Sequence, residues 1–378
     1  MNNIKIDHDI KVLLIGGSGT LSKAVLAESI AKGYALTIMN RGRKKHQVPA
    51  GVEHLICDVK NEGALKEILK DRSFDVVVDF VSRIPSETRM LYSVFNGICK
   101  QYIFISTACV YRRNQEDMPI KEDSPKPNKN WSYNIEKFEC EEILKSLSKD
   151  SKAYYTIVRP YITYDNERIP FGIAPEYKYH RTIIERIKSG KPMFIWGDGQ
   201  TMTTSTYVFE FALGLVGLFL NDKARNEDFH ITSSMSYPVI DVLNLLYEKL
   251  GRTPQIVHLS NEELAEWLPQ YRSMLLGDRV LPAVFDNSKI KSAVPEYESK
   301  ITLSEGLDKI LEYYNNKSDY DYDYKYDALI DRMLANKGVK CGYKQYTCSS
   351  TRSRLMYSIY KYFQYTTANR ICHLLKLI

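Results

Sequence analysis

The sequence predicts an α/β protein with a doubly wound parallel sheet. Two observations favour this class: an apolar stretch at residues 12–15 that ends abruptly in glycines, and the alternation of β-branched stretches with helical ones after it. Strands that alternate with helices imply a parallel sheet covered on both faces. The 378 residues, 44% of them hydrophobic and 26% charged, are ordinary for a globular protein and long enough for about two domains.

The first strand runs into a glycine-rich turn and then into a helix expected over residues 20–32. A dinucleotide pyrophosphate needs this order, because the chain must turn sharply, approach the phosphates closely and present the free N–H groups of a helix N-terminus. The spacing is imperfect, since Ser22 stands where a third glycine is expected. A tight turn in some other α/β protein is the competing interpretation.

The end of the second expected strand, residues 35–39, bears on the choice of cofactor. Asn40, Arg41 and Arg43 follow it, and no acidic side chain stands there. A carboxylate at this place would bind the 2′-hydroxyl of NAD, whereas a basic residue suits the 2′-phosphate of NADP. The cluster therefore favours NADP over NAD, unless it is only a solvated loop.

Asp58 and Val59 follow the third expected strand, residues 52–56. Asp58 could hydrogen-bond the adenine amino group, or it could cap a helix. Further strands are expected over residues 74–80 and 102–105, with a helix over residues 86–99 between them.

Polar residues that follow the fifth strand form a candidate catalytic group. Ser106 and Thr107 come where ligands bind at the carboxyl end of a parallel sheet, and a helix expected over residues 133–148 carries Tyr133 and Lys137 on one face. A free tyrosine titrates near pH ~10, but a nearby ammonium and the positive ring of an oxidised nicotinamide both favour its phenolate. Tyr133 is therefore the candidate base for a substrate hydroxyl, with Thr107 holding the same oxygen.

Together these motifs resemble the extended short-chain dehydrogenase/reductases, and among them the NAD-dependent epimerase/dehydratase (nucleotide-sugar epimerase) family. The matching segments follow the family's order: residues 16–22, 106–111, 133–137, 158–160, 196–199 and 284–289. The resemblance implies a Rossmann-type NAD(P)-binding domain over residues 1–163, with later returns to the sheet, and mainly a substrate-binding lobe over residues 164–335. It also implies a catalytic triad of Thr107, Tyr133 and Lys137.

Residue pattern and resemblance together give a set of expected cofactor contacts, and no metal site is expected. The set comprises Gly16, Gly17, Ser18, Gly19, Thr20, Leu21, Asn40, Arg41, Asp58, Val59, Phe80, Val81, Ser106, Tyr133, Lys137 and Pro160.

The chain departs from the family pattern at several functional positions. Ala108 and Cys109 stand where the 4,6-dehydratases of the family carry an acid and a base, and an alanine cannot transfer a proton. This argues against that dehydratase chemistry. Thr203 and Leu276 fall where the family has arginines that bind the substrate diphosphate, and the nearby Arg279 is offset.

The tail, residues 336–378, lies outside the resemblance. Residues 331–378 contain nine Lys/Arg against one Asp, a charge of +8, so the rest of the chain carries −2 of the total of +6. One or two helices are expected over residues 353–378, with apolar stripes at Leu355, Met356, Ile359, Tyr360 and Phe363, and at Ile371, Leu374, Leu375 and Ile378. Packing on the body or on a second subunit, as in a homodimer, is favoured over contact with an anionic membrane surface or with nucleic acid.

Three other features have interpretations that involve no catalytic or binding role. Seven cysteines without metal spacing suit the reduced thiols of a cytoplasmic protein, and no stretch has the pattern of a signal peptide or a membrane span. His180, His230 and His258 share no ligand spacing and are expected to be structural or at the surface. The tyrosine-rich residues 315–326 could be a linker, a helix cap or an edge strand.

The sequence thus favours an NAD(P)-dependent epimerase that acts on a nucleotide-linked sugar. The alternatives are an NADPH-dependent keto-sugar reductase and a non-catalytic binding protein on the same fold.

Overall fold

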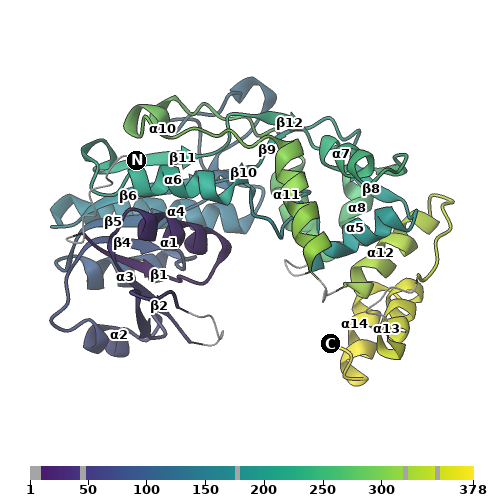
Figure 1. The fold of residues 1–378 in the computed structure, drawn as a ribbon, viewed down its shortest axis with the longest axis horizontal. Coiled ribbons are helices and arrows are strands. Elements are labelled where there is room, and N and C mark those ends of the chain that lie inside the picture. The colour runs from purple at the N-terminus through teal and green to yellow at the C-terminus, as the bar shows by residue number, and fades with distance from the viewer. Residues whose placement is uncertain (1–9, 43–47, 175–178, 318–321, 345–349) are drawn as a thin grey trace. The chain divides into compact units, whose positions relative to one another are not determined.

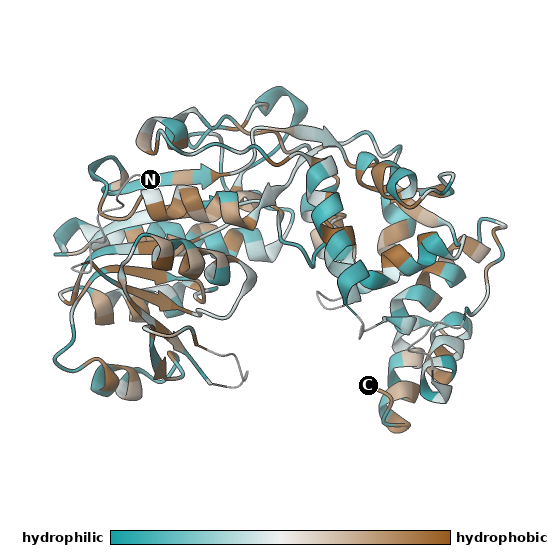
Figure 2. Cartoon of the chain, viewed as in Figure 1, coloured by the Kyte–Doolittle hydropathy of each residue, from teal (hydrophilic) through white to brown (hydrophobic). Residues whose placement is uncertain are grey.

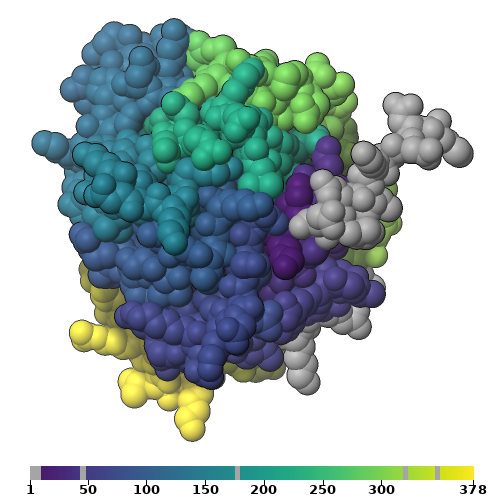
Figure 3. Space-filling model, turned by 90° about the vertical axis from the view of Figure 1, so that its left-hand side faces the viewer, coloured from purple at the N-terminus to yellow at the C-terminus, as the bar shows by residue number. Residues whose placement is uncertain are grey.

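The computed structural model describes residues 10–42, 48–174, 179–317, 322–344 and 350–378. The chain divides into two compact units, each built from separated segments (Figure 1). Unit 1 comprises Met1–Thr163, Thr204–Met235 and Val284–Lys300, and unit 2 comprises Tyr164–Thr203, Ser236–Ala283 and Ile301–Ile378. Figure 3 shows one face of unit 1, where green and teal atoms of later segments lie against blue atoms of the first one.

Unit 1 is organised around a seven-stranded parallel sheet, in the strand order β11-β6-β5-β4-β1-β2-β3. The strands are β1 (Lys11–Ile15), β2 (Ala35–Asn40), β3 (Glu53–Ile56), β4 (Phe74–Asp79), β5 (Cys99–Ile105), β6 (Tyr154–Pro160) and β11 (Glu227–Ile231). The order reverses between β1 and β4, so the carboxyl ends of these two strands flank the crevice where such sheets bind ligands. The doubly wound sheet expected from the sequence is confirmed.

Helices cover both faces of this sheet, because successive strand residues point to opposite sides. On one face Val12 and Leu14 pack against α1 (Thr20–Ala31) and α6 (Val208–Gly217). On the other face Leu13 and Ile15 pack against α2 (Glu62–Ile68), α3 (Pro85–Phe95) and α4 (Ser132–Leu147). Both core layers consist of fully or nearly fully buried apolar side chains, which explains why the strands read as continuous apolar stretches.

One expected helix is shorter in the structure. The helix expected over residues 86–99 ends at Phe95, because Gly97 has a φ of +109° and Cys99 already belongs to β5. Helix α6 begins at Val208, since Thr206–Tyr207 form the short strand β10.

Unit 2 is mainly helical. Its helices include α5 (Arg181–Lys188), α7 (Asp241–Lys249), α8 (Asn261–Trp267), α11 (Leu303–Asn316) and α12 (Tyr324–Ala335), and β8 (Met193–Trp196) pairs in parallel with β13 (Ile256–Leu259). A fully buried ion cluster joins Arg186 of α5 and Lys191 to Asp327 and Asp331 of α12, with Lys191 Nζ 2.6 Å from Asp331 Oδ2. In the tyrosine-rich stretch, α11 ends at Asn316 and α12 starts at Tyr324, and residues 318–321 lie outside the described residues.

The tail forms two helices, α13 (Thr351–Tyr362) and α14 (Tyr365–Leu374), and α13 packs on α12. Tyr357, Ile359 and Tyr360 are buried, and the Tyr357 hydroxyl donates a 2.5 Å hydrogen bond to Asp331 Oδ2. The expected apolar stripes are therefore buried only in part within the chain. Leu355 and Phe363 of the first stripe are exposed, because α13 turns Tyr357 toward the buried Asp331. Leu374, Leu375 and Ile378 of the second stripe are exposed as well.

Within the described residues, no helix is both long and apolar enough to cross a membrane.

Candidate active site

The glycine turn after β1 is closely packed, and the Ser22 hydroxyl bonds to its backbone. Gly16 has a φ of +91°, and a methyl group added to it would lie 2.5 Å from Val81 Cγ1. One added to Gly17 would lie 2.9 Å from Ile38 Cβ, so the turn is packed too tightly for a side chain at either position. Ser22 Oγ accepts a 2.9 Å hydrogen bond from Gly19 N and donates one of 2.9 Å to Gly16 O. The serine at the third glycine position thus closes the turn with its own hydroxyl.

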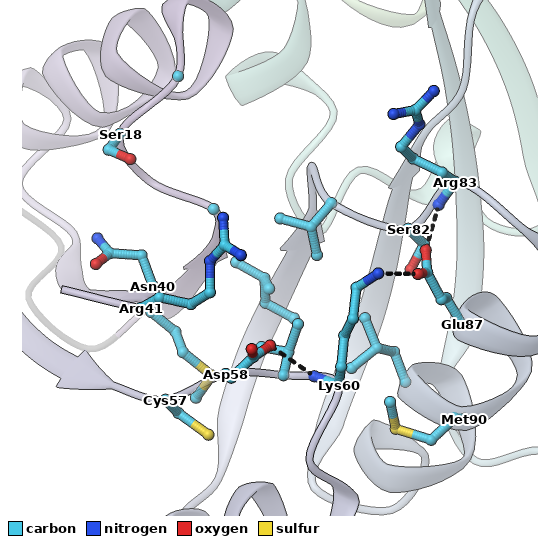
Figure 4. Close-up of a pocket in the computed structure, with 17 residues that line it drawn as sticks. Ser18, Asn40, Arg41, Cys57, Asp58, Lys60, Ser82, Arg83, Glu87 and Met90 are labelled. Atoms are coloured by element: carbon cyan, nitrogen blue, oxygen red, sulfur yellow. Dashed lines mark hydrogen bonds and ion pairs between the residues drawn. The ribbon is translucent and has the colours of Figure 1, made fainter. Parts of the chain in front are cut away.

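A cavity of about 570 Å³ opens beside this turn, at the carboxyl ends of β1, β2, β3 and β4 (Figure 4). A volume of this size is typical of a small-molecule site. Eight of the expected cofactor contacts line it: Gly16, Ser18, Gly19, Asn40, Arg41, Asp58, Val59 and Val81. The other expected contacts lie outside its lining: Gly17, Thr20, Leu21, Phe80, Ser106, Tyr133, Lys137 and Pro160.

The end of β2 brings a cation to the cavity. Arg41 is exposed and its side chain points into the cavity (Figure 4), whereas Arg43 lies outside the described residues. The Asn40 side-chain oxygen accepts a 2.8 Å hydrogen bond from Gly42 N, which holds the backbone after Arg41.

Asp58 does not cap α2, because Asn61 is the N-cap residue of that helix and accepts a hydrogen bond from Ala64 N. The helix-cap interpretation of Asp58 is therefore wrong, and its exposed carboxylate faces the cavity.

Two residues that line the cavity form an ion pair, which sequence reasoning missed. Lys60 Nζ lies 2.6 Å from Glu87 Oε1, and Glu87 Oε2 accepts a 2.9 Å hydrogen bond from Arg83 N (Figure 4). Lys60 follows β3, Arg83 follows β4 and Glu87 lies in the first turn of α3, so only the folded sheet brings them together. The Lys60 ammonium and these hydrogen bonds lower the pKa of Glu87, although its partial burial opposes them.

Lys137 is a buried cation that joins the ends of two strands. Its Nζ donates hydrogen bonds to Ser82 O at 2.9 Å and to Ile105 O at 2.8 Å, just beyond β4 and at the end of β5. Burial lowers the pKa of Lys137 to about 8, against the opposing effect of the buried Asp79 carboxylate. Ser82 also lines the cavity, so the ammonium lies directly behind one of its walls.

Tyr133 lies one helical turn before Lys137 and contacts Thr107. The Thr107 side chain acts on the Tyr133 phenol and favours its ionised form, and Thr107 Oγ1 accepts a 3.2 Å hydrogen bond from Cys109 N. Burial, with a smaller contribution from the Cys109 thiol, raises the pKa of Tyr133 to about 12, while Arg83 and Thr107 act in the opposite direction. The lowered pKa expected from the sequence is therefore not found in the protein alone, because desolvation outweighs the effect of the Arg83 cation.

Behind this group lies a buried polar network that the sequence did not reveal. The Ser106 hydroxyl donates a 2.5 Å hydrogen bond to Glu141 Oε1, so it is turned toward α4. Arg159 of β6 donates to both oxygens of Glu141 and also pairs with Asp228 of β11 at 2.5 Å. The signal that could have located this network is an arginine inside an otherwise apolar strand, since a buried cation needs anionic partners.

The expected histidine roles agree with the structure. His230 is buried between the Tyr111 hydroxyl at 3.3 Å and Asp286 O at 2.7 Å, and desolvation lowers its pKa to about 4. His180 is buried, accepts a hydrogen bond from Ile169 N, and has its pKa lowered to about 3 by burial. His258 lies at the surface.

Uncharged residues stand at the two positions where the resemblance implies diphosphate-binding arginines. Thr203 is buried at the end of β9 (Met202–Thr204), and Leu276 lies in a wide helical turn over Leu275–Arg279. Arg279 forms an ion pair with the buried Asp278, so its charge is already compensated within that turn.

A glycine turn between β1 and α1, at the point where the order of a parallel sheet reverses, defines the class of dinucleotide-binding Rossmann folds. The chain belongs to the NAD-dependent epimerase/dehydratase family, whose family model matches residues 12–232. The resemblance stated from the sequence motifs is thus confirmed, and with it an NAD-dependent enzyme of the extended short-chain dehydrogenase/reductase type.

Several curated proteins are similar to this chain in sequence. Among curated proteins, it is 26% identical to the chloroplast stem-loop binding protein of 41 kDa b of Arabidopsis thaliana, over 69% of this chain and 68% of that protein. It is 21% identical to 2′-dehydrokanamycin reductase of Streptomyces kanamyceticus, over 79% of this chain and 83% of that protein.

Among solved structures, UDP-glucose 4-epimerase of Thermotoga maritima is similar in fold, with a TM-score of 0.65 and 21% identity over 80% of this chain and 98% of that one. UDP-glucuronic acid 4-epimerase of Bacillus cereus gives a TM-score of 0.64 and 19% identity over 81% of this chain and 99% of that one. At these identities the likeness establishes the fold alone.

Proposed function

We propose that this protein is an NAD(P)-dependent epimerase of a nucleotide-linked sugar, with Thr107, Tyr133 and Lys137 as its catalytic residues. The observation that carries the proposal is the position of Tyr133 on α4, one helical turn before the buried Lys137 ammonium, which is bonded to Ser82 O and Ile105 O at the ends of two strands. The two 4-epimerases of similar fold support it. Ala108 and Cys109 argue against the elimination of water, for which the family uses an acid and a base at these positions.

The cavity suits a nicotinamide dinucleotide. Gly16 and Gly17 leave a cradle that any Cβ would fill, and the first amides of α1 have no partner within the helix. We assign the pyrophosphate to this turn, the adenosine ribose to Arg41 and the adenine to Asp58, with Lys137 reaching the nicotinamide ribose. Because Arg41 is cationic, we further propose that the site accepts the 2′-phosphate of NADP.

When bound, an oxidised nicotinamide supplies a hydride acceptor and a positive charge that favours the Tyr133 phenolate. The Tyr133 phenolate oxygen accepts the proton of a substrate hydroxyl and returns it at the end of the turnover. The Thr107 side chain favours the phenolate, because it lowers the pKa of the Tyr133 phenol. Lys137 keeps its proton at neutral pH, because its pKa is about 8, and adds a second positive charge beside the reacting atoms.

One observation favours a second function, an NADPH-dependent reduction of a keto group. In the protein alone Tyr133 has a pKa of about 12 and is protonated at neutral pH, as the acid of a reductase must be. Arg41 in the cavity and the similarity to 2′-dehydrokanamycin reductase agree with this alternative.

A substrate screen distinguishes these functions. The purified protein is first assayed by absorbance and fluorescence for retained cofactor, then incubated with UDP-, GDP-, CDP- and dTDP-sugars and each nicotinamide cofactor, and the products are identified by NMR. An epimerase will retain NAD⁺ and interconvert two sugars, whereas a reductase will exchange NADPH and consume it. Absence of cofactor binding and of turnover would contradict both and favour a binding protein, as the name of the Arabidopsis relative suggests.

A further inference from the structure

The C-terminal helical pair, α13 and α14 with the residues that follow them to Ile378, exposes an unusual amount of apolar surface. Ten large apolar side chains are exposed in the described part of the chain, and six belong to this pair. They are Leu355, Tyr362, Phe363, Leu374, Leu375 and Ile378, with Leu374 83% exposed. Figure 2 shows hydrophobic and hydrophilic stretches mixed along these two helices.

Four of these side chains share one end of the pair. Arg352 at the start of α13 donates hydrogen bonds from Nη2 to Lys376 O at 3.2 Å and Leu377 O at 2.9 Å, so the start of α13 lies beside the end of the chain. Leu355 follows Arg352 by one turn, and Leu374, Leu375 and Ile378 flank the two acceptor carbonyls. We call Leu355, Leu374, Leu375 and Ile378 the apolar end.

The outward orientation of the apolar end is fixed by polar contacts on the opposite side. Tyr357 donates to the buried Asp331 at 2.5 Å, and the Tyr360 hydroxyl lies 2.6 Å from Asn369 Oδ1, which joins the two helices. Cys372 and Ala368 are fully buried on the inner side of α14. The aliphatic side chains therefore cannot turn inward without breaking contacts to a buried charge.

The charged side chains of the chain after Asp331 are all basic. No Asp or Glu follows Asp331 in the sequence, whereas nine Lys or Arg do, among them Arg352, Arg354 and Lys376 beside the apolar end. A twofold contact with a second copy would bring these cations face to face. Nucleic acid offers the opposite charge but little that aliphatic side chains could bind, since bases stack on aromatic ones. An anionic bilayer surface satisfies both features, because leucines enter the acyl boundary while lysines and arginines contact lipid phosphates.

We propose that α13, α14 and residues 375–378 form a docking surface for an anionic phospholipid bilayer, with the apolar end inserted at the headgroup boundary. This surface is independent of the proposed catalytic function.

The test is flotation of the full-length protein with vesicles of phosphatidylcholine and of 70:30 phosphatidylcholine:phosphatidylglycerol. We expect at least tenfold stronger binding to the anionic vesicles, weakened at high salt. Leu374→Ser combined with Leu375→Ser should weaken it by about tenfold or more. Arg354→Gln combined with Lys376→Gln should weaken it by roughly 25-fold, at about fivefold per basic residue. Ile30→Ser, which removes a 43% exposed apolar side chain from α1, is the control and should change nothing.

Circular dichroism and thermal unfolding establish that each variant is folded. The proposal is overturned by equal binding to both vesicle types, by no binding at millimolar lipid, or by an equal loss in Ile30→Ser. It is also overturned if the Leu374/Leu375 variant changes only the oligomeric state in light scattering, or if the tail binds a stem-loop RNA but not the vesicles.

Discussion

The Lys137 ammonium donates a 2.9 Å hydrogen bond to the carbonyl oxygen of Ser82, a residue that itself lines the dinucleotide-sized cavity. A second bond reaches Ile105 O, so one buried cation fixes the ends of β4 and β5 relative to the cavity wall. This contact links the predicted catalytic helix to the predicted cofactor site.

Replacing Lys137 tests that link. We expect Lys137→Met to weaken NAD binding by about tenfold, because the ribose loses a charged donor and two strand ends lose their shared partner. Calorimetric titration with NAD measures the change. Lys145→Met is the control, since Lys145 lies on the same helix but pairs with Glu142 at the surface, and it should bind NAD like the unaltered protein. Equal losses in both variants would refute the special role of Lys137.

Arg41 tests the choice of cofactor. Arg41→Ala should weaken NADPH binding by roughly 10- to 100-fold and NADH binding by less than about threefold, because only NADPH carries a 2′-phosphate for the guanidinium. Fluorescence titration with both cofactors checks this, with Lys66→Ala on the surface of α2 as control. Similar losses for both cofactors would mean that Arg41 does not face the 2′-position.

Glu122 makes stability depend on pH. Burial raises the pKa of Glu122 to about 7, so between its unfolded pKa near ~4.3 and pH 7 the folded state binds more protons than the unfolded one. Its stabilising contribution is present in acid and is lost as the pH rises through 7. Glu122→Gln keeps an acceptor for His230 N and cannot ionise, so its stability relative to the unaltered protein should rise by up to about 3 kcal/mol from pH 5 to pH 8. Thermal unfolding across this range would contradict the account if the difference were constant.

Tyr357 anchors the tail to unit 2. Tyr357→Phe should lower the free energy of unfolding by about 2 kcal/mol, because the buried Asp331 carboxylate loses a hydrogen-bond donor. Tyr362→Phe removes a hydroxyl from a side chain that is 75% exposed and should change it by less than about 0.5 kcal/mol. Denaturant unfolding compares the two, and a harmless Tyr357→Phe would show that the tail is held by apolar packing alone.

Local patterns were enough to predict the sheet, and eight of the residues that they named line the cavity beside the glycine turn. The apolar strands and the glycine turn are contiguous in the sequence, so their physical requirements can be recognised from a few residues. The Lys60–Glu87 pair and the Ser106–Glu141–Arg159 network could not be predicted, because their members come from different elements that only the fold brings together.

The tail shows a second limit. Helical periodicity predicted one or two helices and placed Leu355 and Phe363 on an apolar stripe, and the structure leaves both side chains exposed. The inner face is decided instead by Tyr357, whose hydroxyl meets a charge buried in α12. The pKa of Tyr133 is raised where the sequence predicts that it is lowered. The reason is similar, because desolvation depends on how deeply the phenol is buried, and burial follows from the fold.

The most direct test of the proposed mechanism is Tyr133→Phe, assayed for NAD binding and for nucleotide-sugar turnover by NMR. Removing one hydroxyl should reduce turnover by at least about 1,000-fold, as expected for loss of a general acid–base, while the dissociation constant for NAD stays within about threefold. Turnover that stays within about tenfold of the unaltered protein would contradict the assignment of Tyr133 as the group that takes the substrate's proton.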